Sequence, residues 1–241
     1  DSCLVGSEMC IRDRSWLVRS NAAAPLDGRR SRHSLRNRMV SEIADFAVIG
    51  AGIAGASAAF RLAEYGTVLL LEGESAPGYH TTGRSAALFS ERYRNPLIRG
   101  LAQASGELLR NPPPGFGDAG LLTDRGLMIV GTASQHEAVR NQFTDEQMRT
   151  GIAEELSVAE ACELCPVLRP DYLGSARLVP QAKDIDVNAL HQGFLRGLAH
   201  AGGQLVCNAR VQGLTHSGGV WRIETPAGDF QAGVIVNAAG A

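Results

Sequence analysis

The stretch that decides the fold is Phe46-Ala47-Val48-Ile49-Gly50-Ala51-Gly52-Ile53-Ala54-Gly55, in which an apolar run ends in the pattern G-x-G-x-x-G. A run of helix-forming residues, 56–63, follows directly. In such a strand–turn–helix unit the glycines permit a tight turn, close approach of a pyrophosphate, and close packing of the helix on the strand. The free N–H groups at the start of the helix attract phosphate. The stretch therefore predicts a dinucleotide site.

A second apolar run, 67–71, ends at Glu72, twenty residues past Gly52. An acid at this position typically accepts hydrogen bonds from the ribose hydroxyls of a bound dinucleotide. We therefore predict strands at 45–50 and 67–72 with a helix at 53–65 between them. The alternative interpretation of Glu72 is a solvated surface charge.

The rest of the chain predicts an alternation of helices and strands, which is typical of an α/β protein. Two histidines are of interest: His80 lies in the loop after Glu72 and is a functional candidate, whereas His191 has no evident partner and is interpreted as a packed or surface side chain. The predicted helices are 95–110, 134–149, 157–164 and 186–201, and the further predicted strands are 127–132, 177–180, 204–212, 220–225 and 230–237.

Composition excludes several classes of function. The chain has 241 residues, 44% of them hydrophobic, and a net charge of −2, so it can form a core and shows no sign of nucleic-acid binding. No apolar run approaches the roughly 18 residues of a membrane-spanning helix. Cys162 and Cys165 form a C-x-x-C pair without the second ligand pair of a zinc site, so we predict structural cysteines and no metal; a redox pair is the alternative. The absence of a disulfide framework indicates a reducing cytoplasm.

The two ends of the chain have unusual features. Residues 5–13 resemble a translated transposase adapter from sequencing-library preparation, and Met39 stands seven residues before the first predicted strand. We therefore expect residues 1–38 to be a non-native, disordered leader. The chain stops at Gly240-Ala241, directly after a predicted strand, so we expect a protein truncated at its C-terminus.

Four further segments carry a family resemblance. They are the loop Gly78-Tyr79-His80-Thr81-Thr82-Gly83-Arg84-Ser85-Ala86-Ala87, the pair Asp184-Ile185-Asp186 and Leu190-His191-Gln192-Gly193, and the late turn Asn237-Ala238-Ala239-Gly240. With the first glycines, they make residues 42–241 similar to FAD-dependent oxidoreductases of the D-amino-acid oxidase superfamily, most of all to the bacterial D-arginine dehydrogenase branch. The resemblance implies a Rossmann-like FAD-binding domain, formed by residues 42–95 and 185–241, with an inserted α+β substrate domain, residues 96–184.

The resemblance also implies FAD as cofactor and a set of residues around it. The pyrophosphate, adenosine ribose, ribityl chain, isoalloxazine and adenine would each be contacted by a different part of this set. The implied residues are Gly50, Gly52, Ile53, Ala54 and Gly55 for the pyrophosphate, Glu72 and Gly73 for the ribose, Thr81, Thr82, Gly83, Arg84, Ser85, Ala86, Ala87 and Leu88 for the ribityl chain and isoalloxazine, Val211 for the adenine, and Ala241 to close the pocket.

The implied reaction is oxidation of an amino acid at Cα, with hydride passing to flavin N5 and an imino acid released. The flavin supplies the chemistry, so no catalytic side chain is expected. The expected substrate-side residues are Leu88, Tyr93 and Leu127. The D-arginine dehydrogenase branch carries a histidine and an acid where this chain has Leu88 and Leu127, so we expect an apolar D-amino acid as substrate and leave the electron acceptor open.

Two alternatives stay open. One is an NAD-dependent dehydrogenase with a simple dinucleotide domain, against which the long insertion and the late Asn237–Gly240 turn argue. The other is a non-catalytic FAD-binding fragment.

Overall fold

The structure, a computed structural model, describes residues 43–91, 95–117 and 120–240. The expectations for residues 1–38, Met39, Tyr93 and Ala241 lie outside the described residues.

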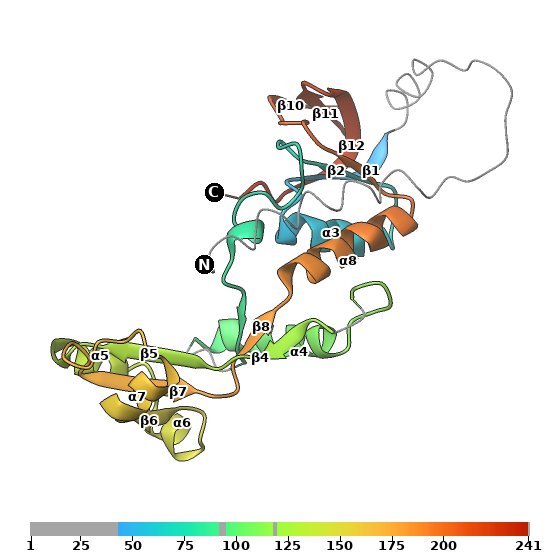
Figure 1. The fold of residues 1–241 in the computed structure, drawn as a ribbon. Helices are drawn as coiled ribbons and strands as arrows, with labels where there is room; N and C mark the ends of the chain where they lie inside the picture. The colour runs from blue at the N-terminus through green and yellow to red at the C-terminus, as the bar shows by residue number, and fades with distance from the viewer. Residues whose placement is uncertain (1–42, 92–94, 118–119, 241) are drawn as a thin grey trace, which may run out of the picture. The chain divides into compact units, whose positions relative to one another are not determined.

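The predicted nucleotide domain is built on a six-stranded sheet of order β10-β11-β12-β1-β2-β9. Strands β12, β1, β2 and β9 run parallel, and β10, β11 and β12 form an antiparallel meander at one edge (Figure 1). The parallel part places the C-terminal ends of β12, β1 and β2 together, which is where α/β sheets bind ligands. The strands are β1 (Ala44–Ile49), β2 (Val68–Leu71), β9 (Gln204–Val206), β10 (Gly213–Ser217), β11 (Val220–Thr225) and β12 (Gly228–Asn237).

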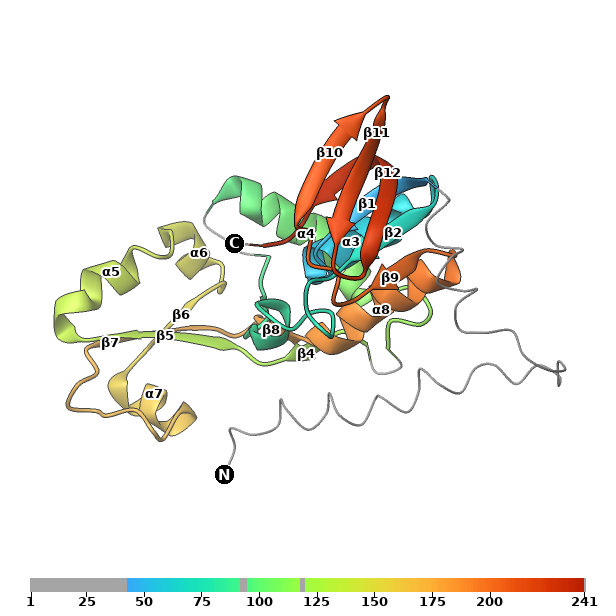
Figure 2. The same cartoon turned by 90° about the horizontal axis from the view of Figure 1, so that it is seen from above.

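Alternate residues of β1 and β2 supply the cores on the two faces of this sheet, as the two-residue period of a strand requires. On one face, Val48 and Leu70 contact Ala59 of α3 (Ile53–Leu62) and Leu198 of α8 (Val187–His200). Both views show α3 and α8 side by side (Figures 1 and 2). The other face is covered by the curled antiparallel strands. Its buried residues are Ala47, Leu69, Leu71, Ala209, Ile223, Phe230 and Ala232.

Two smaller sheets lie outside the six-stranded sheet. The first has the order β3-β8-β4 and the second β5-β7-β6. Helix α4 (Pro96–Arg110) begins at Asn95, whose side chain accepts from the amides of Leu97 and Ile98. The remaining elements are the 3-10 helix η2 (Thr82–Arg84), β3 (Leu88–Phe89), β4 (Leu122–Asp124), β5 (Leu127–Gly131), η3 (Ala133–Gln135), α5 (His136–Arg140), α6 (Asp145–Arg149), β6 (Glu154–Leu156), α7 (Val158–Leu164), β7 (Ser175–Val179) and β8 (Lys183–Ile185).

Two of the predicted elements were wrong. The helix expected at 134–149 is three short helices, because Thr144 forms a capping box with Gln147 and starts a new helix, α6. The strand expected at 204–212 ends at Val206, because Asn208 takes a positive φ of 56° and the chain then crosses to the opposite edge of the sheet to begin β10. By contrast, the helices predicted to begin at 157 and 186 are confirmed, with Ser157 and Asp186 as the N-caps of α7 and α8.

Candidate functional site

In the glycine-rich turn between β1 and α3, close backbone contacts leave no room for a side chain at Gly50 or Gly55. Gly50 has φ +98°, and a Cβ there would collide with the carbonyl of Ala238. A Cβ on Gly55 would overlap the Gly50 carbonyl oxygen. The late turn is held beside the first because the Ala238 amide donates to the Ile49 carbonyl at 2.8 Å. The two turns singled out in the sequence therefore meet at one edge of the sheet.

Gly52 differs from these two glycines, since the fold itself does not require it. Its φ of −73° and ψ of −174° suit any residue, and a Cβ would approach only the Thr82 hydroxyl, at 3.2 Å. Gly52 is the N-cap of α3, offers no side-chain cap, and is followed by no acid in the first turn. The positive end of the helix dipole therefore meets no acidic side chain in the first turn of α3, which fits a phosphate group, although the Thr82 hydroxyl lies close by.

Glu72 follows β2 and binds the same turn from the other side. One carboxylate oxygen accepts from the Ala51 amide at 2.9 Å, and the other accepts from the Glu74 amide, also at 2.9 Å. Each oxygen keeps a second lone pair, so the carboxylate can still accept hydroxyl groups. Glu72 is thus oriented by the backbone and is not a freely solvated charge.

The loop after β2 contacts the start of α3. Thr82 Oγ1 accepts from the Ile53 amide at 2.9 Å, and the Gly83 amide donates to the Gly78 carbonyl at 2.8 Å. Arg84 lies over the ring of Tyr79, 5.1 Å from its centroid. Farther along, Ala87 has a φ of +33°, which is strained for a residue other than glycine. Such strain gathers at ligand sites, and it falls within the predicted cofactor loop.

His80 lies at the exposed side of this loop. Its Nε2 lies 3.1 Å from Glu74 Oε1, which also accepts from Arg210 at 3.0 Å. Arg210 lies beside Gly73, just after the end of β2, and it pairs with Glu74. This places the next residue, Val211, near Gly73. The residues predicted for the ribose and adenine therefore lie close together.

Leu88 and Leu127 come together in a different part of the fold. Both pack on a small apolar cluster with Val179 and Ala182, beside Phe143 and Met148. Leu88 is in register with Asp184 on the neighbouring strand, and that carboxylate is bound by Arg125 at 2.5 Å. The surroundings of the two leucines are apolar, and the nearby acid already has a cationic partner.

One buried side chain, His191 on α8, was not recognised as part of the site from the sequence. Its Nε2 lies 2.8 Å from the carbonyl oxygen of Ala51, in the glycine-rich turn. Burial lowers the pKa of His191, against the opposing effects of that hydrogen bond and of the Glu72 carboxylate. The ring is therefore neutral near pH 7 and carries its proton on Nε2, since a carbonyl oxygen can only accept. No local signal could have revealed a contact between residues 140 positions apart.

His191 makes stability depend on pH with a defined sign. The pKa of His191 in the folded protein lies below the ordinary value of 6.5. Below about pH 6.5 the unfolded chain therefore binds more protons than the folded protein, and the free energy of unfolding decreases as the pH is lowered. His191→Gln removes this titration and should reduce the loss of stability between about pH 7 and pH 5. Thermal unfolding across this range tests the expectation, and parallel curves for the two proteins would contradict it.

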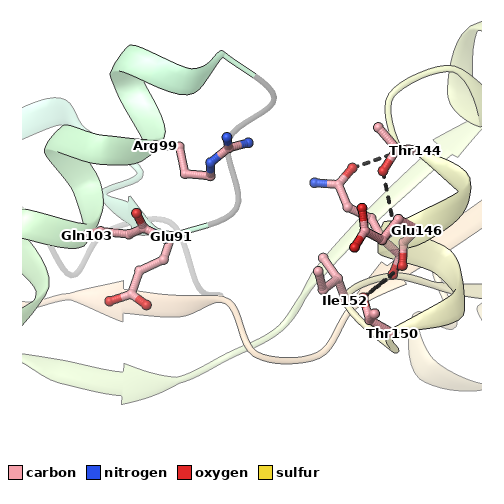
Figure 3. Close-up of a pocket in the computed structure, with 8 residues that line it drawn as sticks. Glu91, Arg99, Gln103, Thr144, Glu146, Thr150 and Ile152 are labelled. Atoms are coloured by element: carbon pink, nitrogen blue, oxygen red, sulfur yellow. Dashed lines mark hydrogen bonds between the residues drawn. The ribbon is translucent and has the colours of Figure 1, made fainter.

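A cavity of about 640 Å³ has a lining separate from all of these residues (Figure 3). It lies between α4, which contributes Arg99 and Gln103, and α6 with its following turn, which contribute Glu146, Thr150 and Ile152. Its lining is mostly polar and includes none of the predicted site residues. The cavity therefore adds nothing to the nucleotide site.

Two negative findings apply to residues 43–91, 95–117 and 120–240. In these ranges no three or more His, Cys, Asp or Glu side chains are grouped as a metal site would require. Nor do they hold any helix with the length and apolar character needed to cross a membrane. Cys162, Cys165 and Cys207 are free thiols, and burial raises the pKa of Cys207.

Solved structures share this fold. Glycine oxidase from Geobacillus kaustophilus has a TM-score of 0.69 and 22% sequence identity, over 83% of this chain and 56% of that one. FAD-bound L-alpha-glycerophosphate oxidase from Mycoplasma pneumoniae (0.66, 19%) and L-proline dehydrogenase from P. horikoshii (0.66, 20%) each match over 83% of this chain and 54% of theirs. The chain thus spans about half the length of the structures it resembles, and at these identities the likeness shows a common fold.

The family is shown by a separate comparison. The family model described as "FAD dependent oxidoreductase" matches residues 45–241, which include both glycine-rich turns and everything between them. The chain therefore belongs to the DAO family of FAD-dependent oxidoreductases.

Proposed function

We propose that the full-length protein oxidises the Cα–N bond of a D-amino acid with an apolar side chain. FAD, when bound, supplies the acceptor for the hydride that leaves Cα. The amine loses a proton, and the resulting imino acid hydrolyses to a 2-oxo acid. No side-chain base is required if the amine arrives neutral, so the protein's part is to bind and orient the substrate.

The proposed cofactor site uses the residues that converge on the glycine-rich turn. Gly50, Gly52, Ile53, Ala54 and Gly55 would hold the pyrophosphate, because the first turn of α3 carries no acid that would compete for its N-terminal end. Glu72 and Gly73 would hold the adenosine ribose, with the Val211 backbone at the adenine. The loop from Thr81 to Leu88 would follow the ribityl chain and isoalloxazine. On this basis residues 42–95 and 185–241 form the FAD-binding domain, and 96–184 the substrate domain.

Solved structures of this fold include glycine oxidase and NikD, an unusual amino acid oxidase. Their presence supports the proposal that the substrate of this protein is an amino acid. The apolar preference rests on one observation, the packing of Leu88 and Leu127 in an apolar cluster. A guanidinium placed there would lose its hydration without gaining a charge partner, which is strongly unfavourable. Asp184 does not remove this cost, because Arg125 already binds it. Tyr93 stays a predicted substrate-side residue, and a cytoplasmic location stays a prediction from cysteine usage.

The substrate preference can be reversed in the full-length enzyme. Leu127→Glu should shift selectivity towards D-arginine, because the new carboxylate can pair with the guanidinium in a partly desolvated site. The measurement is kcat/KM for D-arginine and D-leucine in both proteins. Leu127→Gln, which is polar and uncharged, is the control and should not produce the shift. If the unaltered enzyme already prefers D-arginine by about tenfold, or 1.4 kcal/mol, the inference from Leu127 is wrong.

A further inference from the structure

His191 binds the glycine-rich turn from the side of α8. The ring is buried, with 4% of its surface exposed, and its Nε2–H donates to the Ala51 carbonyl at 2.8 Å. The amide of the same residue, Ala51, donates to Glu72 at 2.9 Å. Both backbone polar groups of Ala51 are therefore held by side chains, one from α8 and one from the end of β2.

This bond also orients the next amide group. The Ala51 carbonyl and the Gly52 N–H belong to one planar trans peptide, so they point in opposite directions. Holding the carbonyl towards His191 therefore directs the Gly52 N–H away from α8. Gly52 is the N-cap of α3, so this N–H belongs to the group of donors at the helix N-terminus.

The same ring supports the second cofactor segment. A Cβ on Gly78 would lie 3.0 Å from Cε1 and 3.2 Å from Nδ1 of His191, so the loop backbone rests closely on the imidazole. The Gly78 carbonyl accepts from Gly83, next to Thr82, whose hydroxyl accepts from the first amide of α3. His191 thus contacts both the turn and the loop, which are otherwise joined through Thr82.

We propose that His191 is a positioning residue for FAD, which fixes the Ala51–Gly52 peptide and the Gly78–Gly83 loop in their binding geometry before the cofactor arrives. The inference rests on the proposed FAD site. A turn that is already ordered loses less conformational entropy on binding, so its affinity is higher. Removing the His191 Nε2–H donor should therefore weaken FAD binding more than another substitution that lowers the stability of the protein by the same amount.

The test is the dissociation constant of FAD for apoprotein made from the full-length protein. His191→Met keeps a similar volume without a donor and should raise Kd about tenfold, which corresponds to 1.4 kcal/mol. His191→Gln keeps an N–H donor and should stay within about threefold of the unaltered protein. Phe194→Leu is the matched control: it removes a buried ring on the same helix that packs on Phe60 and Phe116, and it should destabilise the protein without weakening FAD binding.

The proposal is overturned if His191→Met binds FAD as tightly as the unaltered protein, or if Phe194→Leu weakens binding as much at an equal loss of thermal stability. It is also overturned if the glutamine variant is no better than the methionine variant. An unaltered protein that does not bind FAD would instead refute the proposed function. If the methionine variant fails to fold, nitrogen-15 spectra of the histidine-labelled unaltered protein decide: a proton on Nε2 alone is expected, and a proton on Nδ1 alone would overturn the proposal.

Discussion

Replacing Gly52 by valine is expected to abolish FAD binding while leaving the protein folded. The backbone at Gly52 has ordinary angles, and a Cβ would contact only the Thr82 hydroxyl, so the fold can accept a side chain after a small adjustment. A bound pyrophosphate would need that same space at the start of α3. The flavin absorbance of the purified full-length protein, set beside its thermal unfolding curve, measures the two effects separately.

The control for this experiment is Gly100→Val. Gly100 lies within α4, and a Cβ there would meet no atom within 4 Å, so the same chemical change is made away from the proposed site. This variant should retain its flavin. Normal flavin occupancy in Gly52→Val would place the cofactor elsewhere.

Gly55→Ala, unlike Gly52→Val, is expected to destabilise the fold itself. A Cβ at Gly55 would overlap the Gly50 carbonyl oxygen, which belongs to rigid backbone and cannot move aside as a side chain can. In an ordinary helix the change from glycine to alanine stabilises by about 1 kcal/mol. Here we expect a loss of about 3 kcal/mol or more, because overpacking forces α3 away from β1.

Urea unfolding of the flavin-free protein measures this loss without any contribution from the cofactor. Gly52→Ala, made three residues earlier in the same turn, should lose much less stability and serves as the control. A Gly55→Ala protein as stable as the unaltered one would show that α3 does not approach β1 this closely.

The strand–turn–helix unit at the predicted nucleotide site was largely predictable because it depends on local patterns. The order of strand, glycines, helix and terminal acid is a sequence signal for β1, α3, β2 and Glu72, and the structure pairs β1 with β2 in parallel. The resemblance assigned both glycine-rich turns to one domain, and the structure brings Ala238 onto Gly50. The roles of these residues towards FAD stay predictions that the variants above can test.

What could not be predicted depends on contacts between distant residues. His191 was interpreted as a packed or surface side chain and noted as part of a segment that carries the family resemblance, and its contact, Ala51, lies on a strand–turn unit far away in the sequence. The end of β9 was missed because the apolar pattern continues past Val206, whereas the chain turns at Asn208 and its next strand, β10, lies at the opposite edge of the sheet. Helix α6 is the exception, because it was missed for a local reason: the capping box of Thr144 and Gln147 starts a new helix within a pattern that otherwise suits one continuous helix.

The most direct test of the proposed function is the visible spectrum of the purified full-length protein before and after anaerobic addition of D-leucine. The account predicts a yellow protein whose flavin absorbance near 450 nm, roughly the usual flavin maximum, is bleached by D-leucine, since the hydride reduces the bound cofactor. L-leucine, with the same side chain and the opposite configuration at Cα, is the control and should leave the spectrum unchanged. A colourless protein with nicotinamide-dependent activity, or a yellow protein that no D-amino acid bleaches, would contradict the account.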